Sequence, residues 1–218
     1  MTARDTILAA VRAGLGARPV DAEQVRREAA SLLDDLPSTR PALGVGALAE
    51  VFAERVTSPK VAATTLDRIA RVAELPAAVG RYLDARSLRR AITLQPAAEL
   101  EALDWSGFEL QAALAADDAV GVGIARWGIA ETGSLVFHSG AETPILANFL
   151  PLHHLVLVRA QTILAYLEDY ADAALATGEK PPRNVNIITG ASGTTDIEGS
   201  LVLGAHGPRY LHVILADG

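Results

Sequence analysis

Small polar residues in the C-terminal half of the chain form the first candidate site. The segment 185–198 runs from the apolar stretch VNII into glycine, serine and threonine, and we expect a helix to begin where it ends. Thr195 and Glu198 would cap that helix, and the backbone N–H groups of residues 190–194 would face an anion or polar ligand. The candidates are Thr189, Gly190, Ser192, Thr194, Thr195 and Glu198 as ligand-binding residues and Asp196 as a catalytic residue. The alternative is a purely structural, well-capped helix after a short loop.

A second candidate is the carboxylate of Glu131, in the turn IAETGS. Small neighbours place Glu131 at a junction between loop and strand, where partial burial would suit a general acid or base. Thr132 and Ser134 add hydroxyl groups to the same turn as ligand candidates. Upstream, Gly121 and Gly123 leave one face of an expected strand without side chains. The alternative role of Glu131 is to accept hydrogen bonds from amides of the turn.

All five histidines lie after residue 110. His153 and His154 are adjacent in the segment NFLPLHH, so on a strand they point to opposite faces and do not bind one metal ion together. His206, in the sequence GAHGPR, is a further ligand candidate near the end of the expected helix. No His-x-x-x-His pair or carboxylate cluster accompanies these histidines, so we predict no metal site.

Several common classes of site have no support in the sequence. The chain has no cysteine, which excludes disulfides, cysteine-ligated zinc and iron–sulfur clusters held by this chain. It lacks the G-x-S-x-G and P-loop motifs, and Gly121-x-Gly123 lacks the third glycine of a dinucleotide-binding loop. The net charge is −7 and no basic face is clustered, so nucleic-acid binding is not expected. The apolar stretches are too short to span a bilayer and the N-terminus is unlike a signal peptide, which predicts a cytoplasmic protein.

The elements that position these residues alternate between helix and strand. Expected helices cover residues 4–14, 21–36, 43–55, 65–72, 76–82, 162–174 and 196–203. Expected strands cover residues 61–64, 91–94, 119–124, 134–138, 155–159, 185–189 and 211–215. Such alternation predicts an α/β fold, with a mostly parallel sheet between two layers of helices. We expect residues 1–40 to form a helical arm and residues 41–218 the α/β domain. The arm would pack on the domain or dock on a partner.

The motifs together resemble one protein family. The matching segments are GIAETGS at 128–134, LPLHH at 150–154, ITGASGTTDIE at 188–198, LVLGAHGP at 201–208 and LHV at 211–213. Jointly they resemble the lactate-utilisation protein C family, the LUD domain once called YkgG-like, over about residues 117–217. The chain departs from the family's pattern at four positions, where we expect Pro, a basic residue, Arg and Ser: Ala191, Gly193, Ile145 and Asn148.

The resemblance implies a fold similar to that of sugar-phosphate isomerases, CoA transferases and 5-formyltetrahydrofolate cyclo-ligases. It also implies a role in oxidising L-lactate to pyruvate beside iron–sulfur partner proteins, which would carry the clusters that this chain cannot hold. The leading hypothesis is a subunit of such a system that binds a small organic acid or a related metabolite, phosphate-bearing ligands included. The alternatives are a non-catalytic scaffold and an independent enzyme acting on a sugar phosphate or a folate.

Overall fold

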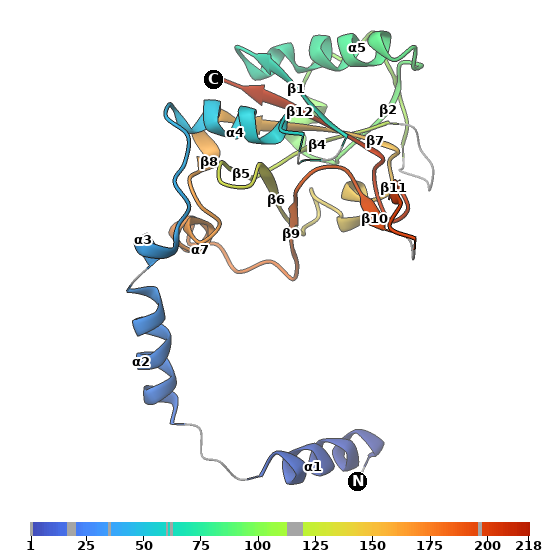
Figure 1. Cartoon of the computed structure of the whole chain (residues 1–218). Coiled ribbons are helices and arrows are strands. Elements are labelled where there is room, and N and C mark those ends of the chain that lie inside the picture. The colour runs from blue at the N-terminus through green and yellow to red at the C-terminus, as the bar shows by residue number, and fades with distance from the viewer. Residues whose placement is uncertain are drawn as a thin grey trace. The chain divides into compact units, whose positions relative to one another are not determined.

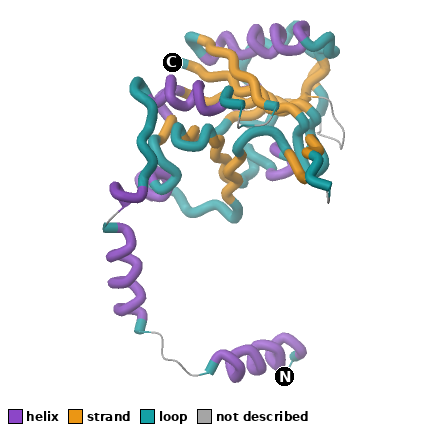
Figure 2. Tube along the Cα trace, viewed as in Figure 1, coloured by secondary structure: helices purple, strands orange, loops and turns teal. Residues whose placement is uncertain are grey.

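The computed structural model describes residues 2–16, 21–34, 36–59, 61, 63–112, 120–195 and 198–218. The chain divides into two compact units, Met1–Pro41 and Ala42–Gly218. The predicted border between arm and domain, after residue 40, lies beside this division. Figures 1 and 2 show that the first unit contains helices, whereas the second contains all the strands.

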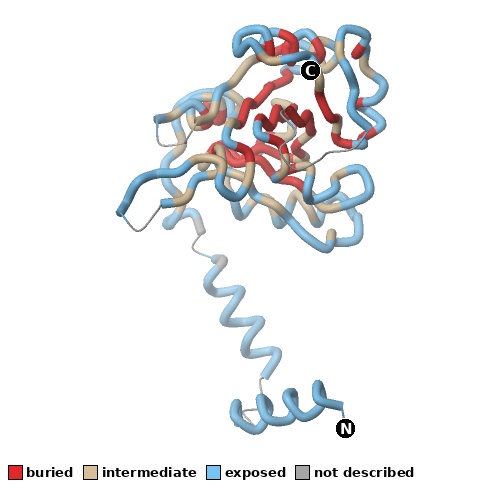
Figure 3. The backbone as a smooth tube through the Cα atoms, turned by 90° about the vertical axis from the view of Figure 1, so that its right-hand side faces the viewer, coloured by how far each residue is buried: buried red, intermediate tan, exposed pale blue. Residues whose placement is uncertain are grey.

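The first unit contains three helices, α1 (Ala3–Leu15), α2 (Ala22–Leu33) and α3 (Leu36–Thr39). A capping box starts α1, because Thr2 Oγ1 accepts from the N–H of Asp5 and Asp5 Oδ2 accepts from the N–H of Thr2. Asp21 caps α2 by accepting from the N–H of Glu23 at 2.9 Å. No residue of α1 is buried, and the unit is pale in Figure 3. Local capping signals therefore account for where these helices begin.

The second unit is built on a six-stranded, fully parallel sheet of order β1-β12-β7-β4-β2-β3. Its strands are β1 (Thr64–Ile69), β2 (Ala91–Leu94), β3 (Glu109–Leu110), β4 (Val120–Ile124), β7 (His153–Arg159) and β12 (Tyr210–Ala216). The central strands are the most deeply buried, as Figure 3 shows in red. Strands buried on both faces are expected to be nearly continuous apolar runs, as in LVLVR of β7.

Different elements cover the two faces of this sheet. On one face, α5 (Leu75–Ala85), the 3-10 helix η1 (Val72–Glu74) and α6 (Ala98–Glu101) pack over Leu155, Leu157 and Ile214. On the other face, α4 (Leu48–Val56) packs with Val156, Val158 and Val213. Successive side chains of β7 and β12 point alternately into these two cores. The structure confirms the predicted α/β class with a mostly parallel sheet.

A second, smaller sheet shares the face that α4 covers. Its order is β8-β5-β6-β9, and a separate hairpin pairs β10 with β11. The strands are β5 (Trp127–Ile129), β6 (Ser134–His138), β8 (Ile163–Leu164), β9 (Val185–Ile188), β10 (Gly193–Thr195) and β11 (Leu201–Leu203). The remaining elements are the 3-10 helices η2 (Ile145–Asn148) and η3 (Ala160–Thr162) and the helix α7 (Asp169–Ala176). This face is therefore covered by strands as well as by a helix, where the sequence predicted helices alone.

Two predicted helices are wrong. Residues 65–72 lie mainly in β1, where Thr64–Ile69 pairs in parallel with Leu211–Ala216 and tertiary pairing outweighs the capping signal of Thr65. The expected helix 196–203 is replaced by β11, because Thr194 pairs with Val202 across the hairpin. The first part of the expected helix 162–174 is β8, and α7 begins only at Asp169.

Within the described residues, no helix is long and apolar enough to cross a membrane.

The turn that carries Glu131 depends on Gly133. Its φ is +70°, and a Cβ atom there would lie 3.0 Å from the backbone nitrogen of Val56 and 3.1 Å from Cγ of Arg55, at the end of α4. The Gly133 N–H also donates to the carbonyl of Ile129 at 2.8 Å. The turn therefore needs both a left-handed backbone and space for α4.

We predict that Gly133→Ala lowers the free energy of unfolding by roughly 2–4 kcal/mol, from left-handed strain plus the steric contact. Gly178→Ala is the matched control, because Gly178 has φ +65° but open space around its Cβ position. The control should lose only about 1–2 kcal/mol. Urea unfolding of both variants measures the difference, and equal losses would contradict a contact with α4.

Candidate functional site

The motif segments of the C-terminal half surround one cavity of about 260 Å3, which we name the motif cavity. It lies beside the amino-terminal ends of β7 and β12, and the loop that follows β9 contributes to its lining. The residues that line the cavity and carry polar side chains or small backbone segments include Asn148, His154, Thr189, Gly190, Ser192 and His206. Four of these, Thr189, Gly190, Ser192 and His206, are predicted ligand-binding residues, and the structure brings them together.

Two backbone hydrogen bonds hold the motif segments against each other. The N–H of Ser192 donates to the carbonyl of Pro208, and the N–H of Gly204 donates to the carbonyl of Ser192, both at 2.8 Å. Gly207 lies close to Ser192, since a Cβ atom at position 207 would be 3.3 Å from Cβ of Ser192. The loop after β9 and the loop before β12 therefore form one wall of the motif cavity.

Asn148 and His154 contribute polar atoms that have no hydrogen-bond partner among the residues that the structure describes. Asn148 is 1% exposed and His154 is 2% exposed, yet Nδ2 and Oδ1 of Asn148 and Nδ1 of His154 accept or donate no hydrogen bond. Buried polar atoms are almost always paired in native proteins, with protein groups, water or a ligand. An amide with a donor and an acceptor, beside an imidazole nitrogen, is therefore available to a small polar molecule in this cavity.

Burial sets the protonation of His154. Desolvation lowers the pKa of His154 to about 4, so its ring is neutral near pH 7. The ring stacks on Phe137, with centroids 5.8 Å apart. His153 lies on the opposite face of the sheet, where its Nδ1 shares a 2.8 Å hydrogen bond with the hydroxyl of Tyr82. A neutral imidazole offers one donor and one acceptor, which suits hydrogen bonding to a hydroxyl or carbonyl group.

A chain of hydroxyl groups joins the turn IAETGS to the motif cavity. Oγ1 of Thr132 and Oγ of Ser134 are 2.6 Å apart, and Oγ of Ser134 is 2.5 Å from Oγ1 of Thr189. The antiparallel pairing of β6 with β9 sets this contact, because Leu135 faces Ile188 in the register. The two predicted site segments therefore meet, and they meet through Ser134 and Thr189.

Glu131 lies outside this arrangement. Its Oε2 accepts from the N–H of Leu167 at 3.2 Å, and its own N–H donates to the carbonyl of Ala165 at 3.0 Å. Glu131 thus fastens the loop after β8, a structural role like the predicted alternative except that the amide belongs to a distant loop and not to its own turn. It is not among the lining residues of the motif cavity. Its catalytic role stays a prediction.

The remaining predicted residues also do not line the cavity. Thr194 and Thr195 lie on β10, and Glu198 lies in the turn that leads to β11. The described part of the expected helix 196–203 is a turn at Glu198 followed by β11 (Leu201–Leu203), so these residues do not form the helix that would have directed backbone amides at a ligand. Asp196 lies outside the described residues.

Asn148 is the functional candidate that sequence reasoning missed. The segment NFLPLHH attracted attention for its histidines, whereas the amide at its start was noted only as a departure from the family's pattern. A polar residue between the apolar stretches ILA and FLP was the available signal. In the structure, η2 buries that amide at the cavity.

Within the described residues, no three His, Asp or Glu side chains gather in a way that would hold a metal ion.

Comparison with known proteins assigns the family. A family model of the LUD domain matches residues 48–216. The chain belongs to the LUD domain family. This match covers almost the whole second unit and confirms the resemblance that the motifs indicated.

Individual relatives match a shorter part of the chain. The uncharacterized protein YkgG of Escherichia coli is 38% identical over 102 residues, which are 45% of this chain and 44% of that protein. Lactate utilization protein C of Halalkalibacterium halodurans and of Bacillus subtilis are each 29% identical over 102 residues, covering 44% and 42% of those proteins. The matched region thus spans less than half the length of these relatives.

A solved structure shares the fold. The crystal structure of a DUF162 family protein from Deinococcus radiodurans aligns with a TM-score of 0.54 and 24% sequence identity. The alignment covers 78% of this chain and 96% of that chain. The likeness therefore supports the α/β architecture of the LUD domain, including its parallel sheet.

Three buried histidines make the stability of the LUD domain depend on pH. Burial lowers the pKa of His153, His154 and His212 to about 4 each, whereas an unfolded histidine titrates near 6.5. Between these values the unfolded chain binds protons that the folded protein does not, so stability falls as pH falls.

We predict that the free energy of unfolding drops between pH 7 and pH 5, by up to roughly 1.4 kcal/mol per pH unit for each buried histidine. Urea unfolding at several pH values measures this slope. His154→Gln should reduce the slope by about one proton, because one of the three groups is removed. A free energy that is independent of pH in this range would contradict the burial of these rings.

Proposed function

We propose that this LUD domain takes part in lactate utilization by binding a small 2-hydroxy or 2-keto acid in the motif cavity. The observation that carries the proposal is the set of unpaired buried atoms of Asn148 and His154 at a cavity of about 260 Å3. The names of the relatives, lactate utilization protein C, support the substrate class. A three-carbon acid is small enough for this volume and has three oxygen atoms to pair.

The polar groups of the cavity complement such an acid. Nδ2 of Asn148 would donate to a carboxylate oxygen, and the backbone amides of Gly190 and Ala191 with the Ser192 hydroxyl would supply further donors. Nδ1 of His154 would pair with the 2-hydroxyl or 2-keto oxygen. Among the described residues that line the cavity, none is Lys, Arg, Asp or Glu. A monoanion held by dipoles fits this lining better than a phosphate dianion does. The described residues also do not offer the helix amino terminus that was expected to bind an anion.

Oxidation of a 2-hydroxy acid to a 2-keto acid releases two protons and two electrons. In our proposal the ring of His154, which is unprotonated near pH 7 because burial lowers its pKa to about 4, accepts the hydroxyl proton. The C2–H bond breaks in the same oxidation: its proton passes to solvent and its two electrons leave the acid. The electrons must leave to another carrier, because a chain without cysteine ligates no iron–sulfur cluster through thiolates. We assign that transfer to iron–sulfur partner proteins, as the family resemblance implies.

The direct test uses Asn148→Leu and isothermal titration calorimetry with L-lactate, pyruvate and inorganic phosphate. We predict that the wild type binds lactate or pyruvate and that the variant loses at least about 10-fold in affinity, since one or two hydrogen bonds are removed. Because the amide is buried and unpaired, the same variant should keep or raise the melting temperature of the ligand-free protein.

Asn184→Leu is the matched control, because Asn184 is exposed and lies outside the motif cavity. It should bind like the wild type. If neither acid binds, or if Asn148→Leu binds as tightly as the wild type, the proposed site is wrong. Binding of phosphate alone would favour an enzyme that acts on a phosphate ester.

A non-catalytic scaffold is the second candidate, and α1 provides the observation in its favour. Ile7, Val11 and Leu15 are 63%, 51% and 76% exposed, at the spacing of one helix face. Such a stripe would suit contact with a partner protein. Deleting residues 2–41 should then abolish copurification with iron–sulfur partners while the second unit keeps its melting temperature, and unchanged copurification would exclude this role.

A further inference from the structure

Basic side chains gather at two adjoining cavities beside the loop that follows β6, and we name these cavities together the basic groove. The cavities measure about 340 and 480 Å3 and share Ser139, Gly140 and Thr143. After residue 110 the sequence contains five basic residues. Three of them line the basic groove: Arg126, Lys180 and Arg183. The motif cavity, in contrast, has no Lys or Arg among its described lining residues, so the basic groove is the better place for an anion of higher charge.

Two of these cations are available to a ligand. Arg126 pairs with Glu179, with 2.6 Å between Nη2 and Oε1. Lys180 and Arg183 are exposed, and neither forms an ion pair with a residue that the structure describes. Two consecutive prolines separate them and restrict the backbone of this segment. The segment therefore presents two positive charges, which match the two negative charges of a phosphate group.

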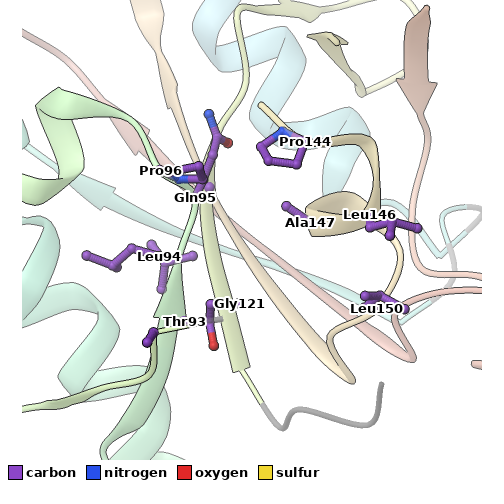
Figure 4. Close-up of a pocket in the computed structure, with 12 residues that line it drawn as sticks. Thr93, Leu94, Gln95, Pro96, Gly121, Pro144, Leu146, Ala147 and Leu150 are labelled. Atoms are coloured by element: carbon purple, nitrogen blue, oxygen red, sulfur yellow. The ribbon is translucent and has the colours of Figure 1, made fainter. Parts of the chain in front are cut away.

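Ser139 and Thr143 add two hydroxyl groups that keep their own hydrogen to donate. Oγ of Ser139 accepts from the N–H of Asn184 at 2.9 Å, and Oγ1 of Thr143 accepts from Nε2 of Gln95 at 3.2 Å. Figure 4 shows the side chain of Gln95 on the side of Pro144, the residue after Thr143. A hydroxyl that accepts an N–H in this way can still donate its O–H to an anion.

Backbone hydrogen bonds hold the loop against the segment that carries the cations. Just beyond the last residue pair of β6 and β9, the N–H of Ser139 donates to the carbonyl of Asn184 at 2.9 Å. Within the loop, Gly140 and Thr143 exchange two backbone hydrogen bonds, of 3.2 and 3.3 Å. The hydroxyl groups and the cations are therefore positioned by the fold before a ligand binds.

Two carboxylates also line the basic groove and limit the charge that it can hold. Glu179 is neutralised by Arg126, whose hydrogen bond lowers the pKa of Glu179. Glu142 is exposed and opposes the two available cations. A ligand with two negative charges therefore fits this lining better than a more highly charged polyphosphate.

We propose that the basic groove binds a phosphate dianion, either free or as the terminal group of a small ester. Lys180 and Arg183 would contact the phosphate oxygens, and the hydroxyls of Ser139 and Thr143 would donate to them. The ring of His138 also lines the groove, so the remainder of an ester would lie against it. The site has its own lining residues and does not rest on acid binding in the motif cavity.

The experiment is isothermal titration calorimetry with inorganic phosphate and glycerol 3-phosphate, in about 0.1 M NaCl to screen distant charges. We expect saturable binding of one phosphate group per chain. Arg183→Gln should weaken binding at least about 10-fold, because a charge-assisted hydrogen bond is lost. Tighter binding of glycerol 3-phosphate than of phosphate would identify an ester as the ligand, and equal affinities would identify free phosphate.

Arg209→Gln is the matched control, because it removes the same charge from an exposed arginine that does not line the basic groove. It should bind phosphate like the wild type. Glu142→Gln should bind phosphate more tightly, since it removes a like charge. Melting temperatures of these variants within a few degrees of the wild type exclude misfolding as the cause of lost binding.

Three results would overturn the proposal: no saturable binding to the wild type, equal affinity for Arg183→Gln and Arg209→Gln, or binding of the dicarboxylate malonate as tight as that of phosphate. Asn148→Leu should bind phosphate normally, so failure of this site and failure of the acid site give different patterns. Loss of phosphate binding in Asn148→Leu, with Arg183→Gln unchanged, would place the phosphate in the motif cavity and contradict the assignment.

Discussion

The parallel register of β4, β7 and β12 is the constraint on which the rest of the structure depends. His153 pairs with Val120 on one side and with Tyr210 on the other, so the three strands begin at the same level of the sheet. The loops that precede β7 and β12 therefore meet at one edge, where Asn148 and the segment 206–208 line the same cavity. A one-residue slip of β7 would turn His154 into the core under α5 and remove it from the motif cavity.

The apolar core explains why the domain tolerates unpaired polar atoms. An unsatisfied buried hydrogen-bonding group costs about 1–3 kcal/mol, yet His154 lies on the face of the sheet that carries an extensive apolar core, which includes Val156 and Val213. The core stabilises the sheet sufficiently to hold the two side chains in place without partners. A ligand that supplies the missing hydrogen bonds would therefore find its polar groups already oriented.

The sequence predicted the class of fold and most of the central strands. Continuous apolar runs such as LVLV of β7 and VILA of β12 carry that signal in their own residues. It failed where pairing outweighs local preference: Thr65 is a good helix cap, but β1 must pair with β12 to complete the sheet. The Thr195–Glu198 capping box failed in the same way, since β10 pairs with β11 across a turn that contains Gly199 at φ +83°.

The candidate site was only partly visible in the sequence. Thr189, Gly190 and Ser192 were recognisable because small and polar residues after an apolar strand indicate a loop with accessible backbone. His206 was predicted near the end of an expected helix, where the structure instead has β11. Asn148 was not recognisable, because its burial depends on η2 packing against strands that are distant in the chain. The contact of Glu131 with Leu167 likewise arises only from the pairing of β5 with β8.

The central claim is that the free polar atoms of Asn148 and His154 are completed by a small acid. The most direct measurement is nuclear magnetic resonance of the 15N-labelled asparagine amide and histidine ring groups while oxamate, an unreactive analogue of pyruvate, is added. The account predicts that the Nδ2 signal of Asn148 and the Nδ1 signal of His154 shift together along one saturation curve. Signals of both groups that stay unchanged while oxamate shifts other residues, or no shift anywhere, would contradict it.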